Sequence, residues 1–169
     1  MARAFTYRDR TWIRLFTTYV RPHLEYAVQA WNPWLKADIE CLEKVQQRAV
    51  NMVTGLRSTT YHDKLKELGL TTLEERRIRG DMLLTWRARS GNLGLGPNYW
   101  FTSSDRQCNV ATRQSSSVGC VTKPRYNLDI RKNFYTVRAV DTWNSLPADI
   151  KQCGDINTFK EKYDNLRGR

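Results

Sequence analysis

The sequence predicts a mainly α-helical protein, with a small helical bundle over residues 8–90, a basic irregular or β-hairpin segment over 91–133, and two C-terminal helices within 134–169. Three observations predict this order. Apolar residues recur at helical spacing through the first half, Gly, Ser, Asn and Arg gather in the middle, and helical spacing returns near the end. With 40% hydrophobic and 11% aromatic residues, the 169-residue chain has the composition of a folded protein.

Two helices are expected before residue 32. The apolar stripe of the first consists of Trp12, Phe16 and Tyr19. This helix is expected to end at Arg21, because the residue before a proline avoids helical conformation. Pro22 then suits the first turn of the second helix, whose apolar face consists of Leu24, Ala27, Val28 and Trp31.

Three more helices are expected in the first half. Helical spacing of apolar residues continues over 39–52, and Gly55 is a suitable stop. A shorter helix is expected over 60–68. The next opens at Thr72 with Glu75 three residues later, which is the pattern of a capping box, and continues towards Arg89.

The segment 91–133 lacks a regular pattern, apart from short β-prone pieces at 108–111 and 120–126. We therefore expect a loop or loose hairpin there. The first C-terminal helix is predicted by Phe134, Val137 and Val140. The second begins near Asp155, and its buried stripe consists of Ile156, Phe159, Tyr163 and Leu166.

The net charge is +11, and much of it lies between residues 106 and 138, where seven basic residues face a single acid, Asp129. Such an excess attracts polyanions through counterion release, regardless of base sequence. A solvated basic surface is the alternative reading of the same charge.

Known catalytic patterns are not found. The sequence has no glycine-rich phosphate-binding motif, no zinc-protease motif and no serine nucleophile motif. Its adjacent acids, Glu74 and Glu75, suit the first turn of a helix. No nucleophile or carboxylate lies at a sequence spacing from His23 or His62 that would indicate a catalytic pair. We therefore expect no enzyme activity from the chain alone, no catalytic residue, no metal site and no cofactor.

Cysteines and apolar runs bear on location. Cys41, Cys108, Cys120 and Cys153 form no C-x-x-C pair and are expected to be free thiols. No apolar run approaches the roughly 18 residues of a membrane span, and the N-terminus has no signal-peptide pattern. We expect an intracellular protein of the nucleus or cytoplasm, without a membrane partner.

Four blocks of sequence occur in a recognisable order. The first, from Phe5 to Leu56, reads FTYRDRTWIRLFTTYVRPHLEYAVQAWNPWLKADIECLEKVQQRAVNMVTGL. The others read YHDKLKELGLTTLEERRIRGDM, RKNFYTVRAVDTWNSLPADI and NTFKEKYDNL. Together they resemble the thumb-type region that follows the palm in reverse transcriptases of non-LTR, LINE-type retrotransposons, of the jockey-like and chicken-repeat-like groups.

The resemblance implies a C-terminal part of an RNA-directed DNA polymerase without its palm aspartates or endonuclease domain. Its expected role is to hold an RNA or RNA–DNA primer–template duplex with low sequence specificity, with a palm-containing polymerase chain as a further partner. Two alternatives stay open, a helical protein-interaction or structural module and a relic reading frame without selected function.

Eight residues are candidates for nucleic-acid binding. Those expected to contact the phosphate backbone are Arg76, Arg87, Lys123, Arg125, Arg131 and Lys132. Arg79 is expected to pack with its head group reaching solvent or to contact phosphate. Trp34 and Trp100, in loops, are candidates for base stacking, whereas core packing is expected of Trp12, Trp31 and Trp86.

Overall fold

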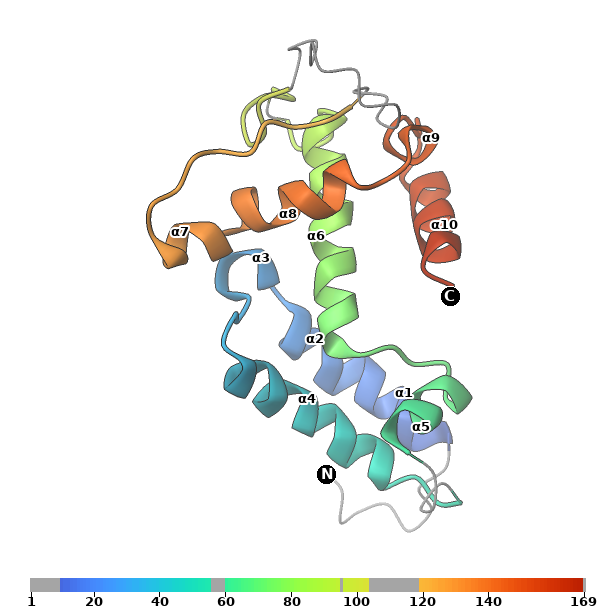
Figure 1. The fold of residues 1–169 in the computed structure, drawn as a ribbon. Coiled ribbons are helices and arrows are strands. Elements are labelled where there is room, and N and C mark those ends of the chain that lie inside the picture. The colour runs from blue at the N-terminus through green and yellow to red at the C-terminus, as the bar shows by residue number, and fades with distance from the viewer. Residues whose placement is uncertain (1–9, 56–59, 95, 104–118, 169) are drawn as a thin grey trace. The chain divides into compact units, whose positions relative to one another are not determined.

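The computed structural model describes residues 10–55, 60–94, 96–103 and 119–168, and its regular structure there is helical (Figure 1). The predicted mainly α fold is confirmed. Two compact units divide the chain, residues 1–78 and residues 79–169. The division lies inside a helix, α6 (Leu73–Arg89), whereas the predicted helical bundle ends at residue 90. The domain boundaries at residues 90 and 133 stay a prediction.

The helices of the first unit before α6 follow one another closely. They are α1 (Arg10–Leu15), the π-helical turn η2 (Phe16–Val20), α2 (Arg21–Glu25), α3 (Val28–Trp31), α4 (Lys36–Asn51) and α5 (Tyr61–Glu67). The last two confirm the helices predicted over 39–52 and 60–68.

The expected helix end at Arg21 is wrong. Helical backbone continues through Pro22, which occupies the first turn of α2. The preceding residues adopt a π-helical turn, in which the Arg21 N–H donates to the Phe16 carbonyl five residues earlier. A proline clashes with the carbonyl four residues before it, and this wider turn accommodates the proline without breaking the helix.

The break comes instead at Tyr26 and Ala27. Tyr26 is extended, and Ala27 takes a left-handed conformation with φ of 50°. Because of this break, Ala27 and Trp31 do not continue the face that begins at Leu24. Trp31 is 40% exposed and donates its indole N–H to the Tyr26 carbonyl at 2.6 Å. The expectation that Trp31 lies in the core is therefore wrong, and Tyr19 is likewise exposed rather than buried.

The core of the first unit lies between α1, α4 and α5. Its fully buried apolar residues are Ile13, Val50, Val53 and Leu65. Trp12 packs against them and donates its indole N–H to the Ala49 carbonyl at 2.9 Å. The expected packing role of Trp12 is confirmed.

A polar junction joins α4 to the segments that follow it. The Glu43 carboxylate accepts from the Tyr61 hydroxyl at 2.5 Å and from the Leu73 N–H at 3.0 Å. Thr72 and Glu75 form the predicted capping box, with reciprocal bonds of 3.2 and 3.3 Å between side chains and backbone N–H groups.

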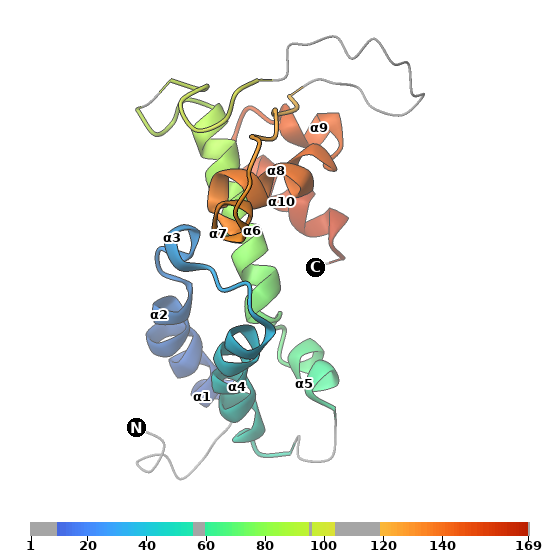
Figure 2. The same ribbon diagram turned by 60° about the vertical axis from the view of Figure 1, so that its left-hand side comes forward.

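The second unit contains the rest of α6 and the C-terminal helices (Figure 1, Figure 2). These helices are α7 (Asp129–Asn133), α8 (Tyr135–Asn144), α9 (Ala148–Lys151) and α10 (Ile156–Leu166). Their common core is rich in aromatic rings. The Phe159 ring lies between those of Trp86, Trp143 and Tyr163, and its centroid is 6.0 Å from each of theirs. The expected core role of Trp86 is therefore confirmed.

The prediction of two C-terminal helices is incomplete. The helices α8 and α10 correspond to it, but α7 and α9 were missed because four or five residues are too short to show helical periodicity. Leu166 was expected in the buried stripe of α10, yet it is 51% exposed at the end of that helix.

The predicted hairpin segment has one feature of a hairpin in its described residues. An isolated antiparallel bridge joins Ser103 to Val121, and the Thr122 N–H donates to the Thr102 carbonyl at 2.9 Å. The β-prone piece at 108–111 lies outside the described residues.

One ion pair joins α6 to α8 in the core of the second unit. The Asp81 carboxylate accepts from Nε of Arg138 at 2.9 Å and from a second guanidinium nitrogen at 3.2 Å. The two side chains are 8% and 16% exposed. Close by, the hydroxyls of Thr85 and Tyr135 are 3.0 Å apart and hydrogen-bonded.

Replacing Ala27 by glycine is expected to raise the free energy of unfolding by about 1 kcal/mol, because glycine adopts the left-handed conformation without a clash at Cβ. Urea unfolding followed by circular dichroism measures the change. The matched control is Ala37→Gly in α4, where glycine is expected to destabilise by up to about 1 kcal/mol. Destabilisation by Ala27→Gly would contradict a left-handed backbone at this residue.

Asp81→Asn is expected to lower the free energy of unfolding of the second unit by about 3 kcal/mol, because it leaves the Arg138 charge half-buried without its carboxylate. Tryptophan fluorescence during urea unfolding reports the loss. The control is Lys36→Gln, which removes the exposed pair with Glu40 at 3.9 Å and is expected to cost less than about 0.5 kcal/mol. Equal effects of the two changes would show that the Asp81 pair is not a structural contact.

Candidate nucleic-acid interface

The second unit carries an exposed stretch, residues 123–134, which we call the basic segment. Its start is fixed to α8 by hydrogen bonds. The Asn144 side chain both accepts from the Val121 N–H and donates to the Val121 carbonyl, each at 2.9 Å. The Trp143 indole N–H donates to the Gly119 carbonyl at 2.9 Å. The chain therefore enters the basic segment from a defined position on α8.

The far end of the basic segment is held through Arg138. The guanidinium that pairs with Asp81 also donates to the Asn133 carbonyl at 3.0 Å. Asn133 is the last residue of α7, so one arginine links the end of α7 to both α8 and α6. The pair of Asp81 with Arg138 thus fixes the position of the candidate site as well as the core.

Lys123 is paired within the protein. Its ammonium group forms an ion pair with the Asp141 carboxylate and lies 5.8 Å from the centre of the Tyr126 ring. The hydrogen bond to Asp141 raises the pKa of Lys123, and burial opposes this without reversing it. Lys123 is consequently positioned by α8 and contributes less uncompensated charge than its sequence position suggested.

Three other predicted cations of this segment are exposed. In the part of the chain that the structure describes, the side chains of Arg125 and Lys132 have no ion-pair or hydrogen-bond partner. The Arg131 guanidinium lies over the Phe134 ring at 5.2 Å from its centre. These charges are available to an anionic ligand.

Large apolar side chains are exposed between these cations. Leu128 and Ile130 are 69% and 70% exposed, and Phe134 is 41% exposed. Phe134 was expected to begin the apolar series of the following helix, so that expectation is corrected. The aromatic part of this surface was not predicted, although Tyr126 and Phe134 lie among basic residues in the sequence, which is a pattern typical of nucleic-acid binding.

Trp100 lies near the same end of α8. It is 40% exposed, and its ring meets those of Tyr99 and Tyr135 edge to face, at 5.7 and 6.4 Å between centroids. Tyr135 directly follows Phe134 in the chain. Trp100 is therefore brought towards the end of the basic segment and is partly exposed there.

Arg87 and Arg79 belong to the same unit and differ in environment. Arg87 is exposed on α6. Arg79 forms two hydrogen bonds of 2.7 Å each with the Asp164 carboxylate of α10. The Arg79 head group is thus paired within the protein rather than reaching freely into solvent, and its possible phosphate contact stays a prediction.

Arg76 and Trp34 belong to the first unit. The Arg76 guanidinium forms an ion pair with the Glu25 carboxylate, and Arg21 lies 3.5 Å from the same carboxylate. Burial, followed by repulsion from Arg76, lowers the pKa of Arg21. The charge of Arg76 is thus used within the protein, and its predicted phosphate contact stays a prediction.

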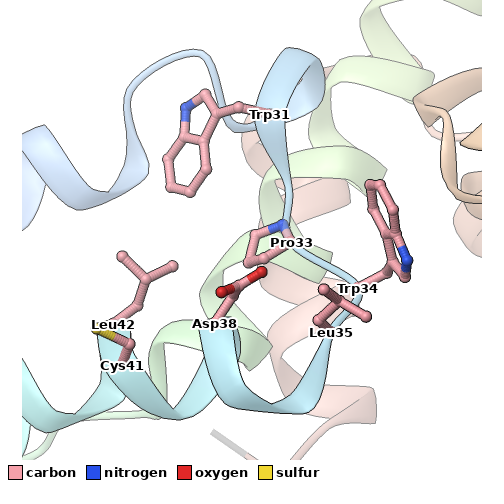
Figure 3. Close-up of a pocket in the computed structure, with 7 residues that line it drawn as sticks. All are labelled: Trp31, Pro33, Trp34, Leu35, Asp38, Cys41 and Leu42. Carbon is pink, nitrogen blue, oxygen red and sulfur yellow. The ribbon is translucent and has the colours of Figure 1, made fainter.

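Trp34 is 51% exposed and lines an open hollow of about 370 Å³, which we call the Trp34 groove (Figure 3). Side chains from α3, the loop after it and the start of α4 form its walls. They are Trp31, Pro33, Trp34, Leu35, Asp38, Cys41 and Leu42. Because an indole in a groove with aliphatic walls suits apolar contact as well as base stacking, the geometry does not single out nucleic acid for Trp34.

Metal ligands, thiols and apolar helices are the other features of the described residues that bear on the kind of site. No three His, Cys, Asp or Glu side chains among them come together as metal ligands. Of the cysteines in that part of the chain, Cys41, Cys120 and Cys153 are free thiols. None of the described helices is both long enough and apolar enough to cross a membrane.

Comparison with protein-family models, with curated proteins and with solved structures found no match for this chain.

Two phenols, Tyr61, which is partly buried, and Tyr135, which is buried, supply a test of how these residues pack. Burial raises the pKa of Tyr61 and Tyr135 above the ordinary value of 10, and the hydrogen bond of Tyr61 to Glu43 raises it further. In the unfolded chain both phenols lose their protons near pH 10, so unfolding releases protons above that pH and stability falls as the pH rises. Phenolate absorbance of the folded protein is expected to show Tyr61 and Tyr135 losing their protons only well above pH 10.

The variant that tests this is Tyr135→Phe. Removing Tyr135 is expected to take one group from the late part of the titration, well above pH 10. Loss of a group that titrates near pH 10 instead would contradict the burial of Tyr135.

Proposed function

We propose that this protein holds nucleic acid of the primer–template type by its backbone, without catalysing a reaction itself, as a non-catalytic part of a retrotransposon RNA-directed DNA polymerase. The observation that supports the binding role best is the basic segment. It combines exposed, uncompensated cations with exposed aromatic rings on a backbone fixed at both ends.

The charges favour contact with phosphates. Lys and Arg side chains bind the backbone of nucleic acids mainly through electrostatic attraction and counterion release. Arg125, Arg131 and Lys132 are suited to this because no carboxylate of the described chain neutralises them. Arg87 is a further candidate on α6, whereas Lys123 and Arg76 are already paired.

The aromatic rings add a second kind of contact. Bases stack on exposed aromatic faces regardless of base identity, typically with about 1–3 kcal/mol for each base. Trp100 and Phe134 are both partly exposed and lie near the same end of α8. This combination favours unpaired bases beside a duplex, and it gives low sequence specificity.

The polymerase assignment rests on the four sequence blocks that resemble the thumb-type region of LINE-type reverse transcriptases. In that setting a palm-containing chain is the protein partner, the catalytic groups belong to the palm, and the work is done in the nucleus or cytoplasm. The alternative function, a protein-interaction module, is favoured by a separate observation, the exposed apolar side chains of the Trp34 groove.

Binding to a short RNA–DNA hybrid with a single-stranded overhang, across a salt series, tests the proposal. The triple variant Arg125→Gln, Arg131→Gln and Lys132→Gln is expected to bind more weakly. The slope of log affinity against log salt is expected to fall by about 2 to 3, since each phosphate contact contributes about 0.7–0.9 to it.

The matched control neutralises three exposed cations of the first unit, Lys44, Arg48 and Lys66, with the same change in net charge. It is expected to keep most of the slope. Equal losses in both variants would mean that net charge alone attracts the nucleic acid, and no binding by the unchanged protein at low salt would overturn the proposed function.

A further inference from the structure

The Trp34 groove joins apolar walls to a carboxylate. Trp31, Trp34 and Leu35 are 40%, 51% and 56% exposed. In Figure 3 the Asp38 carboxylate projects between them towards Pro33. An apolar surface of this kind is usually covered by a partner, and the carboxylate restricts that partner to one that carries positive charge.

Acidic groups continue beyond the groove. A second hollow of the first unit shares Trp34 and is lined by Glu40, Glu43 and Glu74, together with Lys36 and Lys44. Lys36 lies 3.9 Å from Glu40. Carboxylates therefore outnumber lysines across the two hollows, on a chain whose net charge is +11.

The basic segment of the second unit has the complementary properties. Arg125 and Lys132 are exposed cations without a carboxylate partner in the described chain. Leu128 and Ile130 are exposed apolar side chains between them, at 69% and 70%. The basic segment carries four cations and one acid, Asp129. Each surface thus carries an excess of the charge opposite to that of the other, and each leaves large apolar side chains in water.

We propose that the Trp34 groove receives the basic segment of a second copy of this chain. In the complex, Leu128 and Ile130 cover the indole of Trp34, and the cations beside them face Asp38 and Glu40. Complementary potentials of this kind accelerate encounter and fix the register of an interface, while burial of the apolar side chains supplies its hydrophobic attraction.

The contact joins two different surfaces of the chain, so two kinds of assembly are possible. Two copies can exchange segments in a closed dimer, or successive copies can form an open chain. The proposal does not depend on the proposed function. Where both hold, nucleic acid on the basic segment competes with self-association, because the same cations cannot face phosphates and Asp38 together.

Charge reversal tests the pairing. The groove variant is Asp38→Lys with Glu40→Lys, and the segment variant is Arg125→Glu with Lys132→Glu. All four side chains are exposed, so circular dichroism is expected to show unchanged helicity. The control reverses two exposed acids outside both surfaces, Glu67→Lys with Glu161→Lys. Sedimentation velocity over a wide range of protein concentration measures association.

The unchanged protein is expected to self-associate, and each variant at least about tenfold more weakly, because like charges then face each other. An equimolar mixture of the two variants, or one chain carrying all four changes, is expected to regain association. The control is expected to match the unchanged protein in strength.

Trp34→Ala is expected to weaken association, whereas Tyr19→Ala, which removes an exposed ring outside the groove, is expected to leave it unchanged. The proposal would be overturned if the unchanged protein stayed monomeric. It would also be overturned if the chain with all four changes associated as weakly as the two double variants. Such results would not bear on the proposed nucleic-acid binding, which the salt series tests separately.

Discussion

The ion pair between Asp81 and Arg138 is the contact on which the second unit and its candidate interface both depend. It joins α6 to α8 by two hydrogen bonds, and the same guanidinium also donates to the Asn133 carbonyl at the end of α7. A lysine could not replace it, because its single ammonium group lacks the planar fork that serves a carboxylate and a carbonyl together. The position of the basic segment is thus set by a nearly buried charge pair.

Pairing within the protein also decides which cations are left for a ligand. Lys123, Arg76 and Arg79 each face a carboxylate of their own unit, so a high net charge overstates the charge that is available. Of the predicted cations that remain, Arg125, Arg131 and Lys132 are close together in the chain and lie beside exposed apolar side chains. This concentration separates a candidate interface from a generally basic surface.

The sequence predicted the longer helices well because their apolar spacing persists over several turns, as in α4 and α6. The predicted helix ends were wrong where a single residue determines the backbone conformation. Periodicity of apolar residues does not indicate the left-handed Ala27 or the π-helical turn before Pro22. The candidate residues for nucleic-acid binding were predicted from their charge and from their expected positions on exposed helix faces or in loops. Their partners were not, because the link of Arg76 to Glu25 joins residues 51 positions apart, and sequence spacing within one helix does not report such contacts.

The break at Ala27 has a consequence for the groove of the first unit. Had the helix continued, the side chain of Trp31 would lie on the same face as that of Leu24, which is partly buried. With the break, Trp31 turns its indole N–H to the Tyr26 carbonyl and its ring lines the Trp34 groove. The exposure of Trp31 therefore follows from a strained residue that the fold retains. Strain of this kind persists where the surrounding structure or a function maintains it, and the strained Ala27 therefore supports the proposal that the groove is a binding surface.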